Sequence, residues 1–333
     1  MDPAEAAGNA LKFVLEAVPG ESILIVADEE KAEVAEAFSS ASISLGLWTR
    51  LFTLEPPQGY RKAVPPHLRE LVISNRPDIY MNLLRGPAEE VGFRIELIRL
   101  ETRRRVRLAH CPGVTLDMLA NGALALAERD YSEMKQLAQE LLATLQDAVE
   151  VRVVSPGGAD FTLLVEGREF FTDVELDWRS LKWINLPVGE VMVAPVESSM
   201  SGKLVAEAAG GVGPVEGGIT IQVSRGRADV ENLECSPEAK EVIQRVLKAD
   251  VQASLLGEFA IGVNRKARVV EEFLESEKVY GTVHVAFGSN RDFPGGRNTS
   301  KSHIDFLILK PTVTVKYRDG STREILAEGE FKL

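Results

Sequence analysis

His284 and His303, two of the chain's four histidines, lie close together in the C-terminal half of the sequence. His303 and Asp305 are two positions apart, so on a strand both side chains project to one face. An imidazole nitrogen and a carboxylate oxygen held in this way can bind one cation, at about 2.0 to 2.2 Å for zinc. The alternative for so short a pattern is a histidine hydrogen-bonded to a structural carboxylate. The pair alone leaves both interpretations open.

Two glutamates lie in apolar sequence of the same half. Glu190 follows a glycine in residues 187–195, and Glu258 repeats this pattern in residues 255–262. A carboxylate buried in such a strand is costly to desolvate unless a metal ion or a basic side chain compensates it. Three carboxylates and two imidazoles are more than one zinc ion requires, and they fit two divalent ions joined by a carboxylate. The predicted metal ligands are therefore Glu190, Glu258, His284, His303 and Asp305.

The charge of the chain limits its partners. Fifty acidic and 38 basic side chains give a net charge of −12. Such a charge repels nucleic acid and anionic lipid, so we expect neither a nucleic acid nor a membrane as partner, but a peptide or small-molecule substrate. Two cysteines are too few for a disulfide framework or a cysteine-based zinc site. The N-terminal residues lack a basic segment followed by an apolar run, and no stretch approaches 18 apolar residues, which predicts a cytoplasmic location.

The first 150 residues alternate between patterns typical of helices and of strands. Residues 22–27 form an apolar run typical of a strand buried on both faces of a parallel sheet, and the acidic, alanine-rich residues 29–38 favour a helix. This alternation predicts an open, doubly wound α/β domain over residues 1–150. Its other predicted elements are helices at 4–18, 66–73, 88–101 and 131–149, and strands at 47–54, 78–84 and 105–110.

Residues 151–333 have a different sequence pattern, with short apolar runs and many glycines. We predict a β-rich second domain that carries the metal site, so the fold class is α/β with an open α/β N-terminal domain and a β-rich C-terminal domain. Its predicted strands are 151–154, 161–165, 191–194, 219–223, 283–287 and 312–317, with one helix at 237–248.

Two common functional motifs are missing from the sequence. The turn after the first predicted strand reads Asp28-Glu29-Glu30, whereas a phosphate-binding loop needs glycines and little negative charge. No Gly-x-Ser-x-Gly elbow of a serine hydrolase occurs. His67 is predicted to be a surface residue at the start of a helix, and for His110, at the end of a strand, a structural role is favoured over a place in an interdomain cleft.

The ordered motifs of the C-terminal half resemble those of the thermophilic aminopeptidase family, most clearly over residues 180–333. This resemblance implies an aminopeptidase-like hydrolase that is a homodimer and holds two divalent ions (zinc, cobalt or manganese), with metal-activated water attacking a peptide or amide carbonyl. It implies that Glu190 bridges the ions and that Glu258 is a ligand that also acts on the water proton. The motifs are Gly189-Glu190-Val191 with Glu197, Gly257-Glu258 with Asn264, Gly281-Thr282-Val283-His284 with Gly288, and Asn298 and Ser300 before His303-Ile304-Asp305.

One departure from the family keeps other functions open. The family has a tyrosine a few residues beyond the first histidine, where this chain has Ser289-Asn290-Arg291-Asp292-Phe293. An inactive metal-binding relative is therefore one alternative. A second is a mononuclear Fe(II) ring-cleaving enzyme, because the chain also resembles 2,5-dihydroxypyridine dioxygenases and His284, His303 and Asp305 could form an iron triad. Hydrolysis is favoured because such a triad would need neither Glu190 nor Glu258.

Overall fold

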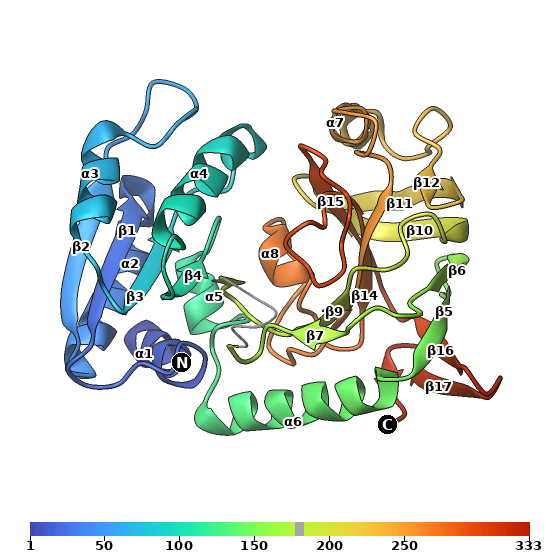
Figure 1. Ribbon diagram of the computed structural model, residues 1–333, viewed down its shortest axis with the longest axis horizontal. Helices are drawn as coiled ribbons and strands as arrows, with labels where there is room; N and C mark the ends of the chain where they lie inside the picture. The colour runs from blue at the N-terminus through green and yellow to red at the C-terminus, as the bar shows by residue number, and fades with distance from the viewer. Residues whose placement is uncertain (177–182) are drawn as a thin grey trace. The chain divides into compact units, whose positions relative to one another are not determined.

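The computed structural model describes residues 1–176 and 183–333, which form two units (Figure 1). Unit 1 consists of Met1–Ser132 with Asp173–Val188, and unit 2 of Glu133–Thr172 with Gly189–Leu333. The predicted division of the chain at residue 150 stays a prediction. None of the helices formed by the described residues is both long and apolar enough to cross a bilayer.

Unit 1 contains a parallel sheet with the strand order β2-β1-β3-β4-β8, which confirms the predicted open α/β fold. Its strands are β1 (Ser22–Asp28), β2 (Trp48–Leu54), β3 (Ile79–Leu83), β4 (Arg107–His110) and β8 (Ile184–Asn185). The helices are α1 (Pro3–Phe13), α2 (Ala32–Ser44), α3 (Pro66–Ser74), α4 (Val91–Glu101) and α5 (Leu116–Ala120), with short 3-10 turns at Glu29–Lys31 and Ala88–Glu90.

Strand β1 is apolar along its length because both of its faces are buried. Leu24 and Val26 point to one face and belong to a core cluster with Leu68 of α3 and Leu97 of α4. The alternate residues of β1 are equally buried, on the side of the strand where helix α2 packs and is itself in contact with α1. Helix layers on both faces explain the uninterrupted apolar run.

Two predicted helices end earlier than expected. The helix predicted over 4–18 ends at Phe13, because Glu16 adopts a left-handed φ of 51° and the amide of Ala17 bonds back to the carbonyl of Leu11. The helix predicted over 131–149 is α6 (Glu128–Leu145), and strand β5 already begins at Ala148. The valines that follow favour a strand, and β5 pairs with β6 and β16.

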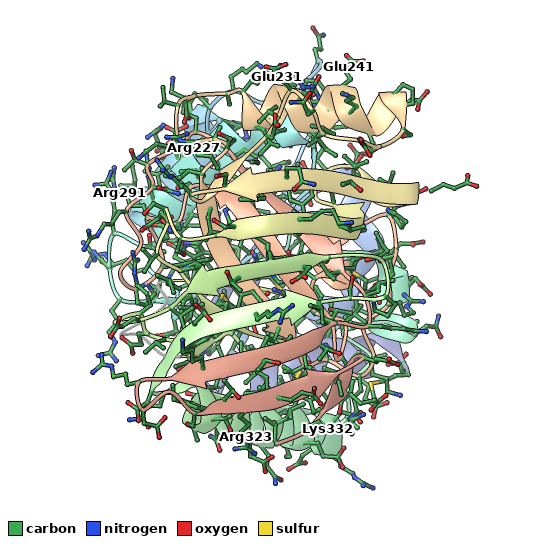
Figure 2. The ribbon with its side chains drawn as sticks, turned by 90° about the vertical axis from the view of Figure 1, so that its right-hand side faces the viewer. Arg227, Glu231, Glu241, Arg291, Arg323 and Lys332 are labelled. Atoms are coloured by element: carbon green, nitrogen blue, oxygen red, sulfur yellow. The ribbon has the colours of Figure 1, made fainter. Side chains whose placement is uncertain are left out.

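Unit 2 contains one large sheet whose main path runs β18-β17-β16-β5-β6-β10-β15-β14-β13-β9-β7, with β11 and β12 attached through β10. Figure 2 shows β11, β10, β6, β5, β16 and β17 side by side, with α7 (Pro237–Leu247) along one end of this row. The strands are β5 (Ala148–Val154), β6 (Asp160–Leu164), β7 (Phe171–Thr172), β9 (Glu190–Val193), β10 (Ser201–Ala209), β11 (Gly213–Ser224), β12 (Arg227–Ala228), β13 (Leu256–Gly262), β14 (Val283–Gly288), β15 (His303–Ile308), β16 (Thr312–Tyr317), β17 (Thr322–Ala327) and β18 (Glu330–Phe331).

Strand β10 joins the two parts of this sheet. Its first residues pair with β6, whereas Ala208 and Ala209 pair with β15. The register shifts between Ala206 and Ala208, and such an irregularity bends a strand and increases its twist. The sheet therefore turns at β10 and carries β15, β14, β13 and β9 as neighbours, with β13 and β14 buried throughout. These four strands carry all five predicted ligands.

Candidate metal centre

The strand register brings the five predicted ligands to one face of the sheet. Glu258, Ala286 and Asp305 are direct partners across β13, β14 and β15. His284 is two residues before Ala286, and His303 is two residues before Asp305, so both imidazoles share this face. Glu190 joins them because its partner on β13 is Gly262, four residues beyond Glu258. Alanines and a glycine occupy the positions between the ligands, which leaves room for the long side chains to converge.

Glu258 is the carboxylate that both histidines share. Its Oε1 lies 3.5 Å from Nε2 of His284, and its Oε2 lies 3.3 Å from Nε2 of His303. Nε2 of His284 is also 3.3 Å from Oε2 of Glu190, and Nε2 of His303 is 3.2 Å from Oδ1 of Asp305. Each histidine therefore faces two carboxylates, and one of the two is common to both.

Three sets of side chains come close enough to hold an ion in the described part of the chain. We call them the inner group (Glu190, Glu258 and His284), the outer group (Glu258, His303 and Asp305) and the third group (Glu277, His284 and Asp305). Within each group the ligand atoms lie within 4.8 Å of one another. All three groups lie in unit 2.

Glu277 was not among the residues predicted from the sequence. It follows the short helix α8 (Phe273–Ser276), and its side chain is 12% exposed. Lys278, the next residue, is fully buried; its ammonium group donates a hydrogen bond to Oε1 of Glu190 and lies 2.8 Å from Oε1 of Glu277. The sequence Glu275-Ser276-Glu277-Lys278 has the composition of a solvated helix end, so no local signal reveals either residue.

Glu258, His284 and His303 hold one another in their charged forms. Burial opposes the ionisation of Glu258, but hydrogen bonds with His284 and His303 outweigh it and lower its pKa to about 2. Burial also opposes the protonation of His284, yet Glu258 and Glu190 raise its pKa to about 9. The pKa of His303 is likewise raised, against burial, by Asp305 and Glu258. Negative charge at this face is therefore compensated by cations, here the two imidazolium groups and Lys278.

The orientation of His303 suits a metal ligand. Its Nδ1 lies 2.8 Å from the carbonyl oxygen of Ser289, which can only accept, so Nδ1 carries the proton and Nε2 faces Glu258 and Asp305. A backbone carbonyl that fixes the ring in this way is a common feature of metal-binding histidines. The His303 side chain is 33% exposed, whereas those of Glu258 and His284 are 5% and 1% exposed. The donor set of imidazole nitrogens and carboxylates fits zinc, cobalt or manganese, with access from the His303 side.

The loop between β14 and β15 borders the exposed histidine. Phe293 of this loop packs edge-on against His303 with the ring centroids 6.5 Å apart. Glu197 holds the loop by accepting hydrogen bonds from the backbone of Arg297 (2.8 Å) and the guanidinium of Arg168 (2.6 Å). Asn298 donates to the carbonyl groups of Leu256 and Gly288, which closes the loop onto strands β13 and β14. The motif residues Glu197 and Asn298 thus support the loop rather than the ligand groups.

The family of the chain follows from a comparison with protein-family models. The model of the thermophilic metalloprotease (M29) family matches residues 127–331. The chain belongs to this family. The match covers helix α6 and nearly all of the large sheet with its candidate ligand groups, and it confirms the resemblance inferred from the motifs. A search of the curated proteins finds no match.

Two solved structures share the fold of this M29 family member. The wild-type AmpT of Thermus thermophilus matches with a TM-score of 0.75 and 19% identity, over 100% of this chain and 99% of that one. The 2,5-dihydroxypyridine dioxygenase of Pseudomonas putida matches with a TM-score of 0.68 and 16% identity, over 99% of this chain and 96% of that one. At these identities the likeness concerns the fold alone.

Proposed function

We propose that this M29 family member is an aminopeptidase-like hydrolase with two divalent metal ions, held by Glu190, Glu258, His284, His303 and Asp305. The observation that carries the proposal is the position of Glu258, whose two oxygens face different histidines. A carboxylate shared between two ligand groups is the arrangement that a pair of ions requires. When bound, such ions polarise a carbonyl and lower the pKa of water from 15.7 toward about 7.

Each carboxylate has a distinct part in this proposal. Glu258 is better suited than Glu190 to bridge the ions, because one oxygen of Glu190 already accepts a hydrogen bond from Lys278. Glu190 presents Oε2 to His284, so it would complete the inner group through that oxygen. His303 and Asp305 form the side that a substrate reaches first, next to Phe293. A peptide or amide substrate, a homodimer and a cytoplasmic location remain parts of the proposal.

The dioxygenase fold gives the second candidate, a site with one iron. That reaction would need His284, His303 and Asp305 on one ion, with two or more open positions. In the described residues, no ligand group contains both histidines, and each histidine is instead grouped with two carboxylates. This pairing favours two ions over one iron. A metal-binding relative without activity is the third candidate, and it would bind metal without turning over any substrate.

Metal analysis of Glu190→Gln separates the first two candidates. Gln keeps the shape of the side chain and removes the charge, so loss of one of two ions and of aminoacyl-anilide hydrolysis is expected. His303→Ala should also lower metal content, and the exposed His67 of unit 1 gives a matched control, His67→Ala, that should not. One iron per chain in both wild type and Glu190→Gln, with no hydrolysis by either, would overturn the proposal.

A further inference from the structure

Lys278 places a buried ammonium group beside Glu190 of the inner group and Glu277 of the third group. We propose that Lys278 makes the two ion sites unequal, so that an ion at the outer group binds first and tightly, and an ion at the inner group binds second and weakly. This inference rests on the proposed two-ion hydrolase site. In this inference the Lys278 ammonium group competes with the second ion for Glu190. The protein would therefore pass through a state with one bound ion.

The Lys278 ammonium group is held firmly in place. The backbone amide of Lys278 donates to the carbonyl of Glu275 (3.1 Å), and its carbonyl accepts from the amide of Asn264 (3.0 Å). Gly262 lets this segment approach the end of β13, since a Cβ there would stand 2.0 Å from the carbonyl oxygen of Val279. The side chain then enters a fully buried position between Glu190 and Glu277. A rotation of the side chain alone therefore cannot move the ammonium group into solvent.

The three ligand groups differ in their relation to this charge. The inner group contains Glu190 and the third group contains Glu277, and Lys278 is paired with both carboxylates. For the outer group, the ion pairs among the described residues join Glu258 and Asp305 to His303, and Glu258 also to His284; none of them involves Lys278. An ion entering on the His284 side must therefore share a carboxylate with an ammonium group. Among the residues that the structure describes, no ammonium group is paired with Glu258 or Asp305, so an ion entering on the His303 side meets no such competition and has the more exposed entrance.

Electrostatics decides the direction of the effect. Two cations near one buried carboxylate repel each other far more strongly than they would in water. We expect the inner ion to bind at least about tenfold more weakly than the outer ion, after allowing for screening by the surrounding carboxylates. If Lys278 only oriented Glu190 through its hydrogen bond, its removal would weaken the binding of the inner ion. If it is a competitor, its removal strengthens that ion.

The test is a titration of the metal-stripped full chain with zinc alone, followed by competition with a chelating dye. Wild type should bind two ions in two steps, with dissociation constants at least about tenfold apart. His303→Ala should abolish the tight step, and Glu190→Gln should abolish only the weak step. Two steps of equal affinity, or loss of the tight step in Glu190→Gln, would overturn the inference. Absence of any bound ion in wild type would overturn the proposed function itself.

Lys278→Met then tests the charge directly. Met has a similar length and no charge, so the second step should tighten and the gap between the steps should narrow, whereas Lys278→Arg keeps the charge and should keep the gap. A weaker or unchanged second step in a folded Lys278→Met protein contradicts the inference. If circular dichroism shows that Lys278→Met does not fold, the assignment of the two steps in His303→Ala and Glu190→Gln decides the question alone.

Discussion

Glu101 and His110 in unit 1 are buried with few charged neighbours, whereas Glu258 and His284 in unit 2 are buried against each other. Burial raises the pKa of Glu101 to about 8, and the hydrogen bond from Asn82 (2.7 Å) offsets only part of this shift. Burial lowers the pKa of His110 to about 3. In unit 2 the shifts have opposite signs, with a pKa of about 2 for Glu258 and about 9 for His284. The partner, and not the depth of burial, decides which form is present.

This contrast distinguishes ionisable residues that are buried in the packing of unit 1 from those that are buried at the candidate metal centre. In unit 1 an acid and a histidine lose their charges and become part of the packing beside the parallel sheet. In unit 2 the same residue types stay charged because they compensate one another, and a metal ion can take over that compensation.

The largest effect is expected for Glu258→Gln. Removing this charge leaves His284 and His303 without their shared partner, and breaking such a buried pair costs about 3 to 5 kcal/mol of unfolding free energy in the metal-free protein. Because the folded-state pKa of Glu258 is about 2, below its ordinary value of 4.5, the deficit should be complete above pH 4.5 and shrink as the pH falls toward 2. Urea denaturation at several pH values measures it. Metal content and hydrolysis should be lost together; retention of two ions would contradict the account.

The same substitution in unit 1, Glu101→Gln, should change the free energy of unfolding in the opposite direction. The folded-state pKa of Glu101 is about 8, above its ordinary value of 4.5, so this residue destabilises the fold increasingly as the pH rises from 4.5 to 8. Glu101→Gln removes this cost and should stabilise the protein by about 3 kcal/mol at pH 7, and not at all below pH 4.5. Thermal unfolding at pH 4 and pH 7 provides the measurement. A destabilised variant at pH 7 would mean that Glu101 is charged in the folded protein.

The two buried histidines give a matched pair for metal binding. His284→Ala should remove one ion, because this histidine belongs to the inner group. His110→Ala should leave metal content unchanged, although it opens space in the packing against Trp183 and costs some stability. Elemental analysis of both purified variants is the measurement. Equal metal loss in both would show that the loss reflects unfolding rather than the removal of a ligand.

The smallest effect is expected for the number of protons that the protein releases when a metal ion binds. His284, with a pKa of about 9, and His303, with a raised pKa, carry protons at pH 7 in the metal-free protein. A metal ligand must present an unprotonated nitrogen, so each ion that binds should release a proton, and the affinity of the ion at His284 should rise with pH up to about 9. Calorimetry in buffers with different ionisation enthalpies measures the release. Binding at pH 7 that releases no proton would show that the imidazoles are already neutral.

The sequence predicts the parts of the site that depend on local pattern. His303 and Asp305 share a face because successive side chains of a strand point to opposite faces of the sheet. Glu190 and Glu258 are unusual because they interrupt apolar runs. The apolar run of β1 equally predicts a parallel sheet covered on both faces. These features need no knowledge of distant contacts.

Other parts of the site depend on contacts that no local pattern encodes. Lys278 and Glu277 belong to a charged segment whose composition predicts solvent exposure, and the close approach permitted by Gly262 brings them to the predicted ligands. The position of Glu258 between His284 and His303 follows from its register with Ala286 and Asp305, which is set between strands far apart in sequence. The early end of the first helix similarly depends on the left-handed conformation of Glu16.

Anomalous diffraction from crystals of the full chain grown with zinc tests whether Glu258 joins two ions. We expect two anomalous peaks, both within about 2.0 to 2.2 Å of a Glu258 oxygen, one also at His284 and the other also at His303. The peak at His303 should be the more occupied at limiting zinc. A single peak bound by His284, His303 and Asp305 together, away from Glu258, would contradict the two-ion site.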